Sequence, residues 1–142
     1  MISITLAGPP LGKGRVRFVK ATGRTFTPER TVTFESRLAF EAQHVMNGRP
    51  LLEGPLSVSM RVFMAIPESK PKRWKADALA RRVFPTKKPD ADNFAKMLDA
   101  LNMIVWVDDS QIVELGVCKR YSDAPRMEIT VEEMQEPEGI FE

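Results

Sequence analysis

A short central stretch combines carboxylates and amines at spacings that suit metal-dependent chemistry. Residues 87–102 read KKPDADNFAKMLDALN. Asp90 and Asp92 are two positions apart, and in an extended segment such side chains point the same way, with Cα atoms about 6.6 Å apart. Neighbouring carboxylates repel each other, and Mg²⁺ removes that cost while leaving coordination positions for a substrate phosphate. The pair is therefore a candidate Mg²⁺ site, and acidic residues in a basic setting suit metal-assisted chemistry on a phosphodiester.

Further charged residues follow at spacings that extend this pattern. If Asp92 caps a helix, Lys96 lies one turn along it at i+4, and Asp99 lies another turn further. Asp108 and Asp109 stand in WVDDSQ, just before a predicted strand. Each feature has a structural alternative: an N-cap for Asp92, a polar turn for the acidic pair, and a helix-surface pair for Lys96 and Asp99. Their combination in a basic setting favours the catalytic interpretation.

The basic residues are concentrated in the first part of the chain. The net charge is +2, but residues 127–142 contain six glutamates and no Lys or Arg, so residues 1–126 carry +8. Two groups stand out: Lys13, Arg15, Arg17, Lys20, Arg24 and Arg30, and then Lys70, Lys72, Arg73, Lys75, Arg81, Arg82, Lys87 and Lys88. This density predicts a polyphosphate partner, with solvated loops as the alternative.

Other chemistries find little support. His44 is the single histidine and belongs to a predicted helix face, and Cys118 is the single cysteine, in a predicted strand. No zinc-ligand spacing occurs, and GPPLGKG lacks the Walker spacing of a nucleotide-binding loop.

Length and composition indicate one globular domain. The chain has 142 residues, of which 43% are hydrophobic and 28% charged. No apolar run reaches the roughly 20 residues of a membrane span, and MISITLAGPP does not read as a signal peptide. A lone cysteine is compatible with a reducing cytoplasm.

The elements that would position these residues alternate between strands and helices. Alternating apolar residues predict strands at 2–7, within 54–67, at 111–122 and within 125–134. Thr27 as N-cap, Pro28 and Gly48 bracket a long helix, and Phe94, Met97, Leu98 and Leu101 predict an amphipathic helix over residues 93–102. We expect a loose basic hairpin after the first strand and a short helix within 71–82. The prediction is an α/β (mixed α+β) fold: one compact domain over residues 1–134, with helices packed on a mixed sheet, and a flexible acidic tail at 135–142.

Three stretches together resemble a known family. They are GPPLGKGRVRF with TGRTFTPER, then KKPDADNFAKMLDALNMIVWVDDSQI, and finally VCKRYSDAPRMEITVEE. The sequence is similar over roughly residues 3–133 to the RusA-type Holliday junction resolvases of bacteria and phages. The spacing D-x-D-N-x-x-K-x-x-x-D-A-L-N, followed by D-D-S-Q-I, carries the resemblance. One departure is Met103, at a position where many members have glycine.

The resemblance implies a small homodimeric endonuclease. Such an enzyme binds four-way DNA junctions and, with Mg²⁺, nicks two opposing strands; we expect Mn²⁺ to substitute, and no small-molecule cofactor or membrane to be involved. By match to the family motif, Asp90, Asp92 and Asp109 are the catalytic metal-binding acids and Lys96 is the catalytic lysine. The resemblance also gives Asp99 and Asp108 supporting roles, and it places the protein in the cytoplasm of a bacterial host, with a phage or prophage origin. The expected DNA contacts are Lys13, Arg15, Arg17, Lys87 and Lys88.

Two alternatives stay open from the sequence. One is a non-catalytic basic dimer that binds DNA junctions and uses its acids only for caps and turns. The other keeps the nuclease chemistry but acts on flaps or stem-loops.

Overall fold

The computed structural model describes residues 1–13, 17–26 and 28–136. Its centre is a four-stranded mixed sheet in the order β1-β6-β4-β5. The strands are β1 (Ile2–Ala7), β4 (Leu56–Ala65), β5 (Ile112–Ser122) and β6 (Arg126–Glu133). β6 is antiparallel to both β1 and β4, whereas β4 and β5 are parallel. The predicted mixed α/β architecture is confirmed.

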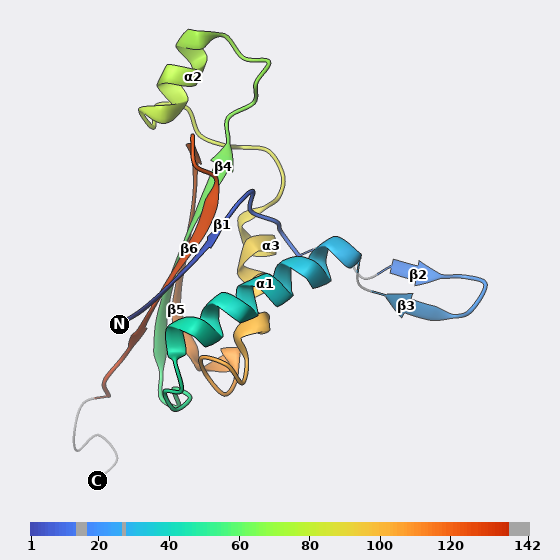
Figure 1. Ribbon diagram of the computed structural model, residues 1–142, viewed down its shortest axis with the longest axis vertical. Helices are drawn as coiled ribbons and strands as arrows, with labels where there is room; N and C mark the ends of the chain where they lie inside the picture. The colour runs from blue at the N-terminus through green and yellow to red at the C-terminus, as the bar shows by residue number, and fades with distance from the viewer. Residues whose placement is uncertain (14–16, 27, 137–142) are drawn as a thin grey trace.

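The sheet buries one face and leaves the other to solvent. In β1 the side chains of Ile2, Ile4 and Leu6 are buried, while Ser3 and Thr5 between them are exposed. The helices α1 and α3 lie on the same side of the sheet (Figure 1). The alternation of apolar and polar residues in the sequence therefore indicates a sheet that is covered on one face, because only that face needs apolar side chains.

The long helix α1 (Glu29–Met46) packs one stripe of side chains onto β1. Phe34, Leu38 and Ala42 recur every four residues and are buried. The helix ends at Asn47, whose φ of 44° is left-handed, a conformation that asparagine tolerates well. The predicted N-cap, Thr27, lies outside the described residues, and the N-cap position belongs to Pro28: its backbone is not helical, and its carbonyl accepts hydrogen bonds from the N–H groups of Thr31 and Val32.

The central stretch forms two short helices instead of the single helix predicted over residues 93–102. α3 spans Ala91–Ala95, and a 3₁₀-helix, η1, continues from Lys96 to Leu101. The apolar positions were predicted correctly: Phe94, Met97, Leu98 and Leu101 are all buried. A 3₁₀-helix keeps residues three apart on one side, so Leu98 and Leu101 stay in the core although the winding changes.

The start of α3 also corrects the predicted cap. The residue before the first helical turn is Asp90, whose carbonyl accepts hydrogen bonds from the N–H groups of Asn93 and Phe94. Asp92 therefore lies inside the first turn and is not the N-cap. The sequence DAD offers two capping positions two residues apart, and the structure uses the earlier one.

The basic segment contains the predicted short helix. α2 (Lys72–Leu79) stands at one end of the sheet (Figure 1) and packs against β5. The ring of Trp74 meets that of Tyr121 edge to face, with centroids 5.4 Å apart. A second 3₁₀-helix, η2 (Asp109–Gln111), leads into β5.

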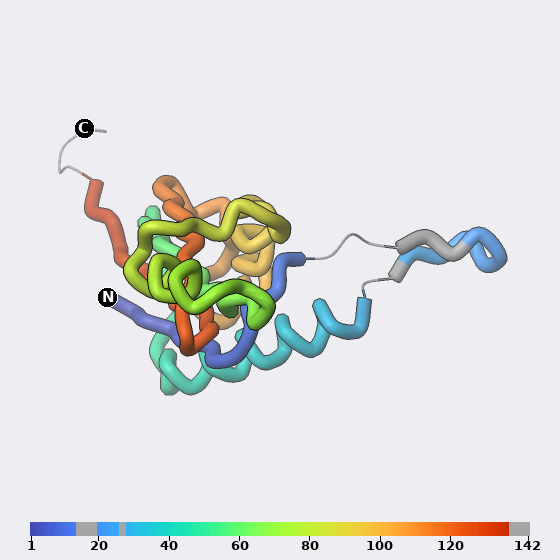
Figure 2. Tube along the Cα trace, turned by 90° about the horizontal axis from the view of Figure 1, so that it is seen from above, coloured from blue at the N-terminus to red at the C-terminus, as the bar shows by residue number. Residues whose placement is uncertain are grey.

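The predicted basic hairpin is present and projects from the body of the protein. β2 (Arg17–Val19) pairs with β3 (Arg24–Phe26), and the pair stands away from the sheet and helices (Figure 2). Arg15 lies outside the described residues, and the structure places only the backbone of Arg17. Most of the predicted acidic tail, from residue 137, is likewise outside them. Within the described part of the chain, no helix is both long and apolar enough to cross a bilayer.

Candidate active site

The acidic segment opens into a cavity of about 670 Å³ that also collects amines. Asp90 and Asp92 line it from the start of α3, and Lys96 lines it from the start of η1. The remaining lining residues are Gly12, Lys13, Lys88, Pro89 and Asn93. Two carboxylates and three lysines thus share one open pocket. The spacing of the central stretch predicts that Asp90 and Asp92 face one point, whereas Lys13 comes from a distant part of the sequence.

The two acids in the pocket suit a hard cation. Asp90 and Asp92 are both exposed, and the backbone of Asp90 is extended. Asn93 adds an amide oxygen to the same lining. Mg²⁺ is commonly held by one or two carboxylates, with water and substrate phosphate completing an octahedron. The donor set of Asp90 and Asp92 in an open pocket therefore fits a divalent metal.

Lys96 stands beside this acid pair. Its ammonium is 3.9 Å from Oδ2 of Asp92, one helical turn away, and it donates a hydrogen bond of 3.4 Å to Oδ1 of Asn93. The side chain of Lys96 is 60% exposed, so the ammonium remains accessible to a substrate. A cation in this position can meet negative charge that develops on a phosphate.

Lys13 enters the pocket from the loop after β1 and is held by carboxylates. Its ammonium donates a hydrogen bond to Oδ2 of Asp99 and lies 3.6 Å from Oε1 of Glu35 on α1. Burial alone would lower the pKa of Lys13, but the hydrogen bond and charge of Asp99, together with Glu35, raise that pKa above its ordinary value. This predicted DNA contact is thus engaged within the protein.

The later acidic pair is organised by a capping box. The Asp108 carboxylate accepts a hydrogen bond of 3.0 Å from the Ser110 N–H, while the Gln111 side chain accepts from the Asp108 N–H at 2.9 Å. Hydrogen bonds from Ser110 lower the pKa of Asp108. Gln111 also donates to the carbonyls of Leu52 and Gly54. Asp108 therefore shapes the turn that carries Asp109.

Asp109 does not line the pocket of Asp90 and Asp92. η2, which carries Asp109, packs against η1, but the lining residues of the cavity do not include it. Across residues 1–13, 17–26 and 28–136, no group of three His, Cys, Asp or Glu side chains is arranged to hold a metal ion. The structure brings together two of the three predicted metal-binding acids.

The basic residues before the acid pair are fixed by their backbone and free at their side chains. The ammonium of Lys119 on β5 donates a hydrogen bond of 2.8 Å to the Lys87 carbonyl. The guanidinium of Arg120 lies over the ring of Phe84 at 4.9 Å. Lys87 and Lys88 are exposed, so both ammonium groups are available to a phosphate backbone.

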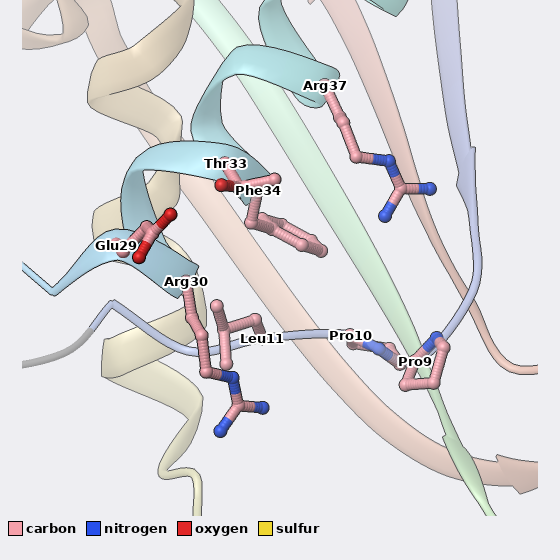
Figure 3. Close-up of a pocket in the computed structure, with 8 residues that line it drawn as sticks. All are labelled: Pro9, Pro10, Leu11, Glu29, Arg30, Thr33, Phe34 and Arg37. Atoms are coloured by element: carbon pink, nitrogen blue, oxygen red, sulfur yellow. The ribbon is translucent and has the colours of Figure 1, made fainter.

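A second cavity lies on the other side of the loop after β1. It has a volume of about 460 Å³ and separates residues Pro9–Leu11 from α1 (Figure 3). Phe34 and Leu11 contribute apolar surface, and Glu29 is its single acidic residue. With one carboxylate and two arginines in its lining, this cavity offers a hard cation fewer donors than the pocket of Asp90 and Asp92 does.

Residues 7–132 match the family described as "Endodeoxyribonuclease RusA". The chain belongs to the RusA endodeoxyribonuclease family. It is also 37% identical over 143 residues to the uncharacterized protein YqaN of Bacillus subtilis (strain 168), covering 94% of this chain and 96% of that protein. The expected resemblance is confirmed, and the acidic pocket lies within the matched residues.

In this RusA family chain, the structure shows which backbone conformation Met103 adopts at the position where many members have glycine. Met103 has a φ of 64°, a left-handed conformation that glycine adopts without steric cost. Its N–H donates to the Trp106 carbonyl, and the Trp106 ring donates through Nε1 to Oδ1 of Asn102 at 2.7 Å. The turn keeps the geometry suited to glycine although the residue is methionine.

Several functional neighbours were not predicted from the sequence. Asn93, Gly12, Glu35 and Gln111 all contact or position the charged residues. Asn93 lies in the central stretch directly after Asp92, and an amide side chain at this position could have been predicted to face the same pocket. Glu35 gave none, because its proximity to Lys13 depends on how α1 packs.

Proposed function

We propose that this protein is a Mg²⁺-dependent, structure-specific endodeoxyribonuclease. It resolves four-way (Holliday) DNA junctions by paired, symmetric nicks and acts as a homodimer. The protein is of phage or prophage origin, and it works in DNA recombination and repair in the cytoplasm of a bacterial host. The observation that carries the proposal is the shared pocket of Asp90, Asp92 and Lys96 in a chain of an endodeoxyribonuclease family.

The residues of the pocket divide the work. Asp90 and Asp92 would hold the metal, with Asp109 as the proposed third acid. When bound, Mg²⁺ neutralises phosphate charge and lowers the pKa of a water molecule that can attack phosphorus. Lys96 donates a hydrogen bond to a phosphate oxygen and offsets the charge that accumulates there during P–O bond cleavage.

The surrounding basic residues supply affinity. Lys87 and Lys88 are exposed next to the pocket, so they neutralise backbone phosphates beside the scissile one. Contacts of this kind are independent of base sequence and orient the duplex. A two-fold dimer would then offer one pocket to each of two opposing strands.

The decisive assay is gel-resolved cleavage of an end-labelled synthetic four-way junction with Mg²⁺ or with EDTA. We expect paired nicks that require Mg²⁺. Asp92→Asn should lower the rate of nicking at least 100-fold, because it removes a carboxylate from the metal site. Junction binding should survive or improve. Asp77→Asn on α2 is a matched control, since Asp77 pairs with Arg82 outside the pocket.

Other outcomes would redirect the proposal. Continued nicking by Asp92→Asn would refute its metal role. Tight junction binding without nicks across several junction sequences would indicate a non-catalytic binding dimer. Faster cleavage of matched flaps or stem-loops than of junctions would change the substrate but retain the chemistry.

A further inference from the structure

The loop after β1, residues 8–13, is anchored at its start and runs to the acidic pocket. The N–H of Gly8 donates to the Pro125 carbonyl at 3.0 Å, and the guanidinium of Arg37 donates to the Ala7 carbonyl at 2.9 Å. Residues 9–11 face α1 across the second cavity (Figure 3). The next two residues, Gly12 and Lys13, line the acidic pocket.

The backbone at Gly12 and Lys13 lies directly against the segment that carries the acids. A methyl group added to Gly12 would lie 2.6 Å from Cβ of Pro89 and 3.3 Å from Cβ of Asn93, so only glycine allows this approach. The N–H of Lys13 donates to the Asn93 carbonyl at 2.9 Å. Any movement of this loop is therefore transmitted to the residues on either side of Asp90 and Asp92.

The Lys13 side chain holds the loop in place. Its ammonium joins Asp99 on η1 to Glu35 on α1. Oε1 of Glu35 is buried and makes no hydrogen bond to any described residue, so the ammonium 3.6 Å away is its compensation. Without Lys13, two carboxylates would face each other beside a pocket that already contains two more, and repulsion would displace them.

We infer that Lys13 is a positioning residue: through Asp99 and Glu35 it fixes the loop whose backbone sets Asn93, and with it Asp90 and Asp92, for metal binding. The inference rests on the proposed function for what the acid pair binds. It replaces the expectation that Lys13 contacts DNA phosphate. Lys88 and Lys96 line the same pocket with exposed side chains, whereas the Lys13 side chain is 26% exposed and already occupied by carboxylates.

The test uses three variants of the pair: Lys13→Met, Asp99→Asn and the double variant that combines them. Lys88→Met is the comparison variant. Four readouts are needed: amide hydrogen exchange of residues 90–99, Mn²⁺ affinity by electron paramagnetic resonance, junction affinity in EDTA, and kcat and KM for junction cleavage with Mg²⁺. We expect Lys13→Met and Asp99→Asn each to accelerate exchange and weaken Mn²⁺ binding at least 5-fold, and to lower kcat more than they raise KM. The double variant should be no worse than either single variant, because one pair is removed in all three.

Junction affinity in EDTA separates positioning from phosphate contact. We expect it to change less than 2-fold in Lys13→Met and to fall in Lys88→Met, whose exchange pattern should remain that of the wild type. Weaker junction binding by Lys13→Met with unchanged exchange would overturn the inference, and so would normal exchange and Mn²⁺ affinity in Asp99→Asn.

Two further features keep the test decisive. If Lys13→Met does not fold, Asp99→Asn and the conservative Lys13→Arg replace it; Lys13→Arg should restore Mn²⁺ affinity, and failure to do so would count against positioning. If the wild-type protein binds junctions but does not nick them, the proposed function fails, whereas exchange and Mn²⁺ affinity still decide whether Lys13 positions the acids.

Discussion

At residue 103 the backbone adopts a conformation that its side chain disfavours. Met103 has a φ of 64° and is 66% exposed, so little packing compensates for the steric cost of a Cβ there. That cost is roughly 1–2 kcal/mol. A glycine at this position would remove the cost, but its greater conformational freedom in the unfolded chain would offset part of the stabilisation.

We therefore expect Met103→Gly to raise the free energy of unfolding by up to about 1 kcal/mol. Urea denaturation monitored by fluorescence measures this change. Met103→Ala serves as the control, because it removes the exposed side chain but keeps Cβ, and it should leave stability almost unchanged. Equal stabilisation by both variants would show that the backbone conformation is not the cause.

The sequence predicted local charge relationships better than distant ones. Asp90, Asp92 and Lys96 lie within seven residues, so their spacing alone keeps them near one another, and all three line one pocket. The partners of Lys13 depend on packing instead: Asp99 is 86 positions away. Nothing local to Lys13 distinguishes a lysine that binds DNA from one that pairs with acids.

Among the elements, the short helix η2 is held in place by the side chain of one residue, Gln111. Gln111 accepts hydrogen bonds from the N–H groups of Val107 and Asp108, both at 2.9 Å. It donates to the carbonyls of Leu52 and Gly54 at 2.9 and 3.0 Å. The turn that carries Asp109 is thereby tied to the chain before β4.

We expect Gln111→Ala to lower the free energy of unfolding by roughly 1–3 kcal/mol, because several backbone groups lose their partner. Chemical denaturation measures the change, and Glu114→Ala, at an exposed position of β5, is the control. If Asp109 contributes to the proposed site, nicking by Gln111→Ala should fall as well. Unchanged stability would mean that water replaces these hydrogen bonds without loss.

The cap of η2 also makes a pH prediction. Hydrogen bonds from Ser110 lower the pKa of Asp108 below its ordinary value of 3.8. Because the folded pKa is depressed, the stabilisation is present above pH 3.8 and is lost as the pH falls through the folded pKa. The stability of wild type should therefore decline more steeply than that of Asp108→Asn below pH 3.8, as measured by acid titration of the circular dichroism signal. Parallel declines would refute the role of this cap.

Strands were easier to predict than the helices near the site. Alternation in β1 and β4 reflects a sheet covered on one face, which is a local pattern. The central segment is divided into α3 and η1, and Phe94, Met97 and Leu101 are buried across both. An apolar period of three to four residues is compatible with both windings, so the sequence alone does not separate them.

For the whole molecule, the exposed lysines before the acid pair should govern how binding depends on salt. The double variant Lys87→Ala/Lys88→Ala should weaken junction binding at all sequences and reduce the slope of log K against log salt concentration by about 2, at roughly 0.9 per phosphate contact. Fluorescence anisotropy at several NaCl concentrations measures the slope. The double variant Lys20→Ala/Arg24→Ala on the projecting hairpin is measured for comparison. An unchanged slope for Lys87→Ala/Lys88→Ala would mean that these two lysines do not contact the phosphates.

The pairing of β1 with β6 has a consequence for how the protein is made. Among the described strands, β1 leaves the ribosome before the others, yet its sheet neighbour β6 leaves after them: Ile2 pairs with Val131 and Ala7 with Arg126. β6 also separates β1 from β4 in the sheet. The sheet therefore cannot close until β6 has been synthesised, and its formation depends on contacts between segments far apart in the sequence, which slow folding. Nascent chains that stop before residue 126 would leave the strand edges of β1 and β4 that pair with β6 exposed, and we expect these products to be bound by chaperones or to aggregate.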